Sequence, residues 1–139
     1  MKIKKFKKEI FQVAFLIFFA LMIFLDRTYS PENLDQYNDY IKDVVGERSL
    51  PLNDFQSDGC SMWPEGFFGV SWEGYCIEHD IKYWLGGTDE ERQKADEELR
   101  DNINKVFSGM GDIVYLGVRL GGKSLIPFPW GWGNGWNNK

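Results

Sequence analysis

The glycine pair at positions 86 and 87 constrains the fold most, because a helical pattern lies on each side of it. Residues from about Tyr75 to Leu85 predict one helix, and a Gly-Gly pair is typical of a helix end. Thr88 and Glu91 then form the Thr-x-x-Glu pattern of a capping box, so a second helix is predicted to begin at Thr88. Two helices joined by so short a turn pack antiparallel. The sequence therefore predicts a mainly α-helical domain.

Apolar residues define the second helix and predict a third. In the second helix they recur at helical spacing, so one face packs inward beside Asp96: Ala95, Leu99, Ile103 and Val106. The apolar segment from Ile113 to Leu120 predicts another helix, which ends at Gly121-Gly122. No alternating strand pattern competes with these helices. From Gly59 to Gly74, glycine, proline and aromatic residues follow no period, so we expect an irregular loop.

The N-terminal thirty residues have the composition of an export segment. Lysines precede an apolar run from Ile10 to Leu25 that only Gln12 interrupts. As a helix, this run would rise about 24 Å, somewhat less than the ~30 Å of a bilayer's hydrocarbon layer. Length therefore leaves both a signal peptide and a membrane anchor open. The nearest cleavage pattern, Thr28-Tyr29-Ser30, precedes a proline, which favours the anchor. In either case, the rest of the chain should cross the membrane.

Charge narrows the classes of function. Positions 1–30 hold 6 of the 16 basic and 2 of the 21 acidic residues, which leaves 10 basic against 19 acidic residues and a net charge of -9. Such a domain is repelled by nucleic acid, so we expect no nucleic-acid partner. We divide the chain into a signal peptide or N-terminal membrane anchor (1–30), a polar linker or short helix (31–57), and a domain with a Trp/Gly-rich tail (58–139).

The two cysteines lie near the only histidine. Outside the cytoplasm, a disulfide between Cys60 and Cys76 is favoured over two buried free thiols. Such a bond would hold the loop that begins at Gly59 against the helix that carries His79 and Asp80. Loop carbonyls would then lie near the Asp80 carboxylate. Carbonyl oxygens, a carboxylate and water form the kind of site that calcium prefers.

The run Cys76-x-x-His79-Asp80-x-x-Tyr83 resembles the secreted phospholipase A2 superfamily, given Cys60 sixteen residues earlier and Asp96 on the next helix. The resemblance covers roughly residues 58–107. The later Tyr-x-Gly-Val-Arg and the Trp-rich tail look like a bacterial branch. The resemblance implies a phospholipase A2-like fold, with a calcium-type loop before the first helix of the pair and a third helix after the second.

The resemblance also implies roles for individual residues. His79 would take a proton from the water that attacks the sn-2 ester of a phospholipid. Asp96 would orient His79, and Tyr83 would support Asp96 through a hydrogen bond. The proposed calcium ligands are the Asp80 carboxylate and three backbone carbonyls, those of Gly59, Ser61 and Trp63. The expected partner is a phospholipid membrane, with the domain on the extracytoplasmic side of the cell membrane or secreted.

Simpler interpretations remain open. His79 can be an ordinary structural histidine, Asp80 an exposed helix acid, and Asp96 a solvated neighbour of two glutamates. The whole domain can be a non-catalytic member of the fold that binds lipid or a protein at the cell exterior. A histidine-aspartate metal phosphohydrolase is a poor third interpretation, because such sites need several histidines. The aromatic tail at 127–136 can contact a membrane interface or pack against the core.

Overall fold

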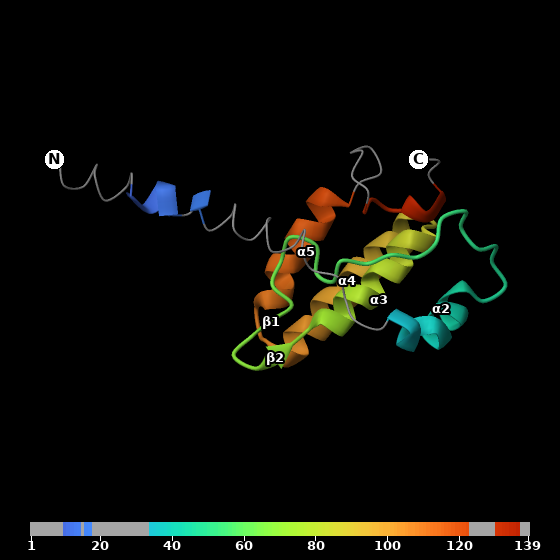
Figure 1. Ribbon diagram of the computed structural model, residues 1–139, viewed down its shortest axis with the longest axis horizontal. Helices are drawn as coiled ribbons and strands as arrows, with labels where there is room; N and C mark the ends of the chain where they lie inside the picture. The colour runs from blue at the N-terminus through green and yellow to red at the C-terminus, as the bar shows by residue number, and fades with distance from the viewer. Residues whose placement is uncertain (1–9, 15, 18–33, 123–129, 137–139) are drawn as a thin grey trace.

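A computed structural model describes residues 10–14, 16–17, 34–122 and 130–136. The fold is mainly helical, with one small antiparallel sheet (Figure 1). Its elements in chain order are η1 (Leu34–Tyr37), α2 (Asn38–Val45), β1 (Gly66–Phe67), β2 (Val70–Ser71), α3 (Glu73–Leu85), α4 (Asp89–Val106), α5 (Met110–Gly121) and η2 (Asn134–Trp136).

The predicted pair is α3 and α4, which lie side by side in Figure 1. Gly86 ends α3 with a φ of 68°, a conformation that favours glycine. The capping box of α4 is confirmed, because the Thr88 hydroxyl accepts from the Glu91 N–H (3.2 Å) and the Glu91 carboxylate accepts from the Thr88 N–H (2.8 Å). Both polar groups at this helix start are thereby satisfied.

The core forms where α3, α4 and α5 meet. Three of the four predicted inward residues of α4 are buried: Ala95, Leu99 and Ile103. The prediction for Val106 is wrong, because α4 ends there and its side chain is 37% exposed. Phe107 takes its place and packs edge-on against the buried Trp72, with ring centroids 5.8 Å apart.

Helix α5 begins three residues earlier than the sequence indicates, at Met110. The reason is a capping interaction from α4, in which the Asn104 side-chain oxygen accepts from the N–H groups of Gly109 (3.0 Å) and Gly111 (2.9 Å). Gly109 itself has no side chain to cap the helix. A side chain at Gly111 would collide with the Arg100 carbonyl, so α4 and α5 approach closely at this point.

The stretch predicted as a wholly irregular loop contains a β-hairpin. Gly66 pairs with Ser71, and Phe67 pairs with Val70. The two turn residues, Phe68 and Gly69, have φ values of 52° and 79°. Strands of two residues are too short to show alternation, and a phenylalanine at the turn hides the usual Asn-Gly signal.

One segment N-terminal to the hairpin packs against the helix pair. The expected short helix within 31–57 is present as η1 and α2, and Ile41, Val44 and Val45 pack against the end of α3. Residues 10–14 and 16–17 are helical, but most of the predicted export segment lies outside the described residues. Among the described helices, none is long and apolar enough to span a bilayer.

The described part of the aromatic tail packs against the core. The Gly133 N–H donates to the Tyr83 carbonyl (2.7 Å), and the indole N–H groups of Trp132 and Trp136 donate to the carbonyls of Gly87 (2.9 Å) and Leu85 (2.7 Å). These bonds satisfy carbonyls at the end of α3. Tail residues 123–129 lie outside the described part of the chain.

Candidate active site

Three helices meet at the carboxylate of Asp96, which is fully buried. From α3, His79 Nε2 lies 2.9 Å from Asp96 Oδ1, and the Tyr83 hydroxyl donates to the same oxygen at 2.7 Å. From α5, Arg119 Nη1 donates to Asp96 Oδ2 at 2.8 Å. Asp96 is therefore no solvated surface acid. It is the centre of a hydrogen-bonded cluster.

The contact with Asp96 fixes the orientation of the His79 ring. An ionised carboxylate only accepts hydrogen bonds, so Nε2 carries the proton. In neutral imidazole the other nitrogen, Nδ1, is then a proton acceptor. It lies 3.9 Å from Asp80 Oδ1, which is too far for a hydrogen bond, and the two groups attract each other as an ion pair only when His79 is protonated. His79 can thus accept a proton on the side that faces Asp80.

Burial, hydrogen bonds and nearby charges shift the pKa values of the groups in the cluster. Burial opposes ionisation of Asp96, but hydrogen bonds from His79, Arg119 and Tyr83 lower its pKa below the usual value. Burial likewise opposes the charged form of His79, yet the carboxylates of Asp80 and Asp96 raise its pKa above the usual value. Burial raises the pKa of Tyr83, as does the charge of Asp96, so Tyr83 stays a neutral donor. The cluster consequently favours an ionised Asp96 beside a basic imidazole.

Helical spacing brings the α3 side chains together. His79 and Tyr83 are four residues apart and share one face of α3, with ring centroids 4.2 Å apart. Because the turn at Gly86-Gly87 folds α4 back along α3, Asp96 lies opposite both rings. Gly122 leaves room for Tyr83, since a Cβ there would collide with the tyrosine ring and hydroxyl.

Asp80 faces the loop that precedes the hairpin. The predicted disulfide between Cys60 and Cys76 is present and joins this loop to α3, with the Cα atoms 5.0 Å apart. The Ser57 hydroxyl donates to Asp80 Oδ2 at 2.6 Å, and the same hydroxyl accepts from the Gly59 N–H at 3.1 Å. Burial and the charge of nearby Asp58 raise the pKa of Asp80.

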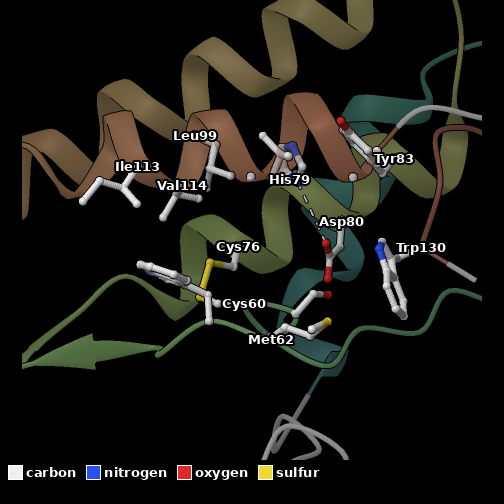
Figure 2. A pocket seen from close by; sticks show the side chains of 17 residues that line it. Cys60, Met62, Cys76, His79, Asp80, Tyr83, Leu99, Ile113, Val114 and Trp130 are labelled. Carbon is white, nitrogen blue, oxygen red and sulfur yellow. Dashed lines mark ion pairs between the residues drawn. A yellow bond between two sulfur atoms is a disulfide. The ribbon is translucent and has the colours of Figure 1, made fainter. Parts of the chain in front are cut away.

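A cavity of about 430 Å³ opens beside these groups (Figure 2). The carboxylate of Asp80, the disulfide, and apolar side chains of α4 and α5 surround it. All four residues predicted to bind calcium line it: Gly59, Ser61, Trp63 and Asp80. Apolar residues form much of the remaining wall: Met62, Leu99, Ile113, Val114 and Val118. His79 lines the same cavity, so its imidazole ring is next to a largely apolar space.

The donor groups near Asp80 determine which cation could bind. Among the described residues, no three His, Cys, Asp or Glu side chains are grouped so as to hold a metal ion. A cation at Asp80 would therefore depend on backbone carbonyls, hydroxyls and water. These oxygen donors fit calcium. A cation would also offset the repulsion between Asp80 and Asp58 that raises the pKa of Asp80.

Two polar partners in the site were absent from the sequence-based prediction. Arg119 is the only basic residue in α5, and no spacing pattern links it to Asp96, which lies 23 positions earlier. Ser57, the hydroxyl partner of Asp80, lies in a polar stretch without a distinguishing pattern. The predicted set of His79, Asp96 and Tyr83 is in mutual contact.

Comparisons with known proteins do not assign a family to this chain. No protein-family model, curated protein or solved structure matches it.

Proposed function

We propose that the protein hydrolyses the sn-2 ester of phospholipids in a calcium-dependent reaction. The observation that carries this proposal is the 2.9 Å contact between His79 Nε2 and Asp96 Oδ1. It leaves Nδ1 of the only histidine available as a base beside an apolar cavity. Activation of water next to a space for an acyl chain is what hydrolysis of a lipid ester requires.

In the proposed reaction, His79 Nδ1 accepts a proton from water as the water oxygen attacks the ester carbonyl. Asp96 stabilises the imidazolium that forms and does not take the proton itself. Tyr83 and Arg119 hold the Asp96 charge in place through their hydrogen bonds. The proton on Nδ1 then passes to the leaving alcohol oxygen, which returns His79 to its neutral form.

Asp80 and the carbonyls of Gly59, Ser61 and Trp63 are the proposed calcium ligands. A bound calcium ion supplies a Lewis acid that polarises the ester carbonyl and stabilises the oxyanion. The disulfide supports this arrangement because it ties the loop at Cys60 to the helix that carries Asp80. Ser57 restrains the Asp80 carboxylate from the other side.

We further propose that the domain acts on the extracytoplasmic side of the cell membrane, anchored by residues 1–30 or secreted. The basic and then apolar composition of that segment supports the proposal. The apolar walls of the cavity favour an acyl chain as the bound group over a polar metabolite.

Fatty-acid release from phosphatidylcholine vesicles, with and without a calcium chelator, tests the function. We expect calcium-dependent release that falls by roughly two to four orders of magnitude in His79→Gln, because glutamine cannot take the proton. Circular dichroism should show that this variant is folded. Hydrolysis that survives the substitution would contradict the mechanism, and vesicle binding without any hydrolysis would favour a non-catalytic lipid-binding domain.

Asp80→Asn separates the proposed metal ligand from the base. Loss of a carboxylate ligand should weaken calcium binding, so activity should recover in part at high calcium. His79→Gln should not recover at any calcium concentration. Equal failure of both variants to respond to calcium would argue against Asp80 as a ligand.

A further inference from the structure

The tip of the β1–β2 hairpin presents two phenylalanines to solvent. Phe68 is 96% exposed and Phe67 is 39% exposed. The hairpin segment Gly66–Ser71 contains no charged residue. Large apolar side chains gathered at an uncharged projection are typical of a surface that meets another apolar phase.

The backbone of Phe68 is also strained. Phe68 and Gly69 form a two-residue turn in which both have positive φ, and such turns favour Asn-Gly. A bulky side chain is rare at a φ of 52°. Phe68 therefore stabilises neither the turn, because of its backbone conformation, nor the protein's solubility, because its apolar ring is exposed. Strain that the fold does not require is a reason to infer a functional role for the residue.

The tip is braced against the core. The ring of Phe67 packs on Trp72 with centroids 5.8 Å apart, and Trp72 packs on Phe107 at the same distance. Trp72 is only 1% exposed. The chain of rings holds the hairpin in a defined position, so its outward direction is a property of the fold.

The hairpin lies beside the start of α5 (Figure 1), since Phe107 joins the ring contacts and precedes that helix. Along α5, Ile113, Leu116 and Leu120 are spaced on one face and are more than half exposed. Ile113 also lines the cavity. Helix α5 has one acidic residue, whereas α4 has seven. These exposed apolar residues therefore lie on a helix, α5, that carries little negative charge.

We propose that the hairpin tip inserts Phe67 and Phe68 into the interface of a zwitterionic phospholipid bilayer. Aromatic side chains favour that interface, and the tip carries no charged side chain whose desolvation would oppose insertion. The flanking acids Glu65 and Glu73 disfavour an anionic surface. This insertion does not depend on the proposed hydrolysis, since it involves neither His79 nor a bound metal.

The length of the N-terminal chain is consistent with a bilayer as the partner. Nine peptide steps separate Leu25, the end of the apolar run, from Leu34, the first residue of η1. Fully extended, they reach at most about 30 Å. If the apolar run stays in the membrane, the folded domain is held next to the bilayer surface.

A photo-crosslinking experiment tests the insertion. The full chain, reconstituted in phosphatidylcholine vesicles, would carry p-benzoylphenylalanine in place of Phe68 or, as a matched control, of Leu52. Leu52 is 73% exposed and lies in the segment that follows α2, and Figure 1 shows α2 well apart from β1 and β2. Mass spectrometry should find a phospholipid adduct at position 68 and little at position 52. Equal adducts at both positions, no lipid adduct at position 68, or a crosslink to a second copy of the chain would overturn the proposal.

A stability measurement tests the strain argument separately. Phe68→Asn restores the favoured Asn-Gly turn, so the full chain in detergent should melt roughly 4 °C higher or more. A lower or unchanged melting temperature would show that the fold itself requires Phe68, and would contradict the functional explanation of the strain.

Discussion

Asp96 joins the candidate site to the fold. Its carboxylate receives hydrogen bonds from α3 and α5 while its own backbone belongs to α4. A buried carboxylate without these donors would be strongly destabilising. The residue that orients His79 therefore also specifies how the three helices pack.

The Asp96 cluster predicts a specific pH dependence of stability. Because folding lowers the pKa of Asp96, its ionised form stabilises the native state above the unfolded pKa of about 4. That contribution is lost as the pH falls through the lower native pKa. Asp96→Asn should reduce the free energy of unfolding by about 3 kcal/mol near pH 6, and the difference from wild type should shrink below about pH 4.

Chemical denaturation across this pH range measures the effect, with Asp39→Asn as the control. The Asp39 side chain is 96% exposed, so the control should follow the wild-type curve. A difference between wild type and Asp96→Asn that grows toward low pH would reverse the expected sign and refute the argument.

Spacing along the chain predicted part of this cluster. His79 and Tyr83 share a helix face by periodicity alone, and the resemblance supplied Asp96 as their partner. Arg119 could not be found in this way, because its contact with Asp96 joins residues 23 positions apart across two helices. A single arginine in an amphipathic helix ordinarily indicates a solvent-facing position.

At the scale of elements, the contact between α4 and α5 depends on Gly111. A methyl group there would meet the Arg100 carbonyl, whereas one at Gly117, in the same helix, would meet no atom within 4 Å. We expect Gly111→Ala to destabilise the fold by about 2 kcal/mol through overpacking. The matched variant Gly117→Ala should stabilise it by up to about 1 kcal/mol, since alanine favours helix. Thermal denaturation of both variants checks the contact, and a stabilising Gly111→Ala would disprove it.

The loop before the hairpin depends on its disulfide. Cys60→Ser opens a loop closed over 16 positions, so the free energy of unfolding should fall by about 3 kcal/mol. Calcium affinity, measured by isothermal titration calorimetry, should fall as well because the loop is no longer tied to α3. Reduced wild-type protein provides the control and should match the variant. Unchanged calcium affinity in both proteins would show that the loop does not contribute to a calcium site.

Element boundaries show where sequence patterns stop being informative. The α3–α4 turn was predictable because its capping signals are local and strong. The start of α5 was not, since its cap is the Asn104 side chain from the preceding helix. The hairpin is held by packing of the Phe67 ring on Trp72, and a contact of this kind produces no periodic sequence pattern in so short a segment.

At the scale of the whole molecule, the charge distribution predicts topology. Five lysines precede the apolar run, and the remainder carries a net charge of -9. A reporter enzyme fused after Lys139 should therefore be active only outside the cytoplasm. The membrane fraction should retain the full-length chain. Activity of the fusion in the cytoplasm would refute export, whereas soluble protein that begins near Pro31 would refute only the anchor.

The bonds between the tail and α3 also govern the order of events during synthesis. The Tyr83 carbonyl accepts its hydrogen bond from the N–H of Gly133, fifty positions later in the chain. The Leu85 carbonyl accepts from the indole N–H of Trp136. Residues up to Trp136 must therefore have left the ribosome before the helix that carries His79 has these native partners. If the chain crosses the membrane unfolded, the helix that carries His79 gains these bonds only after residue 136 has crossed. In that case the cytoplasm of the producing cell would not contain α3 with its hydrogen bonds to the tail.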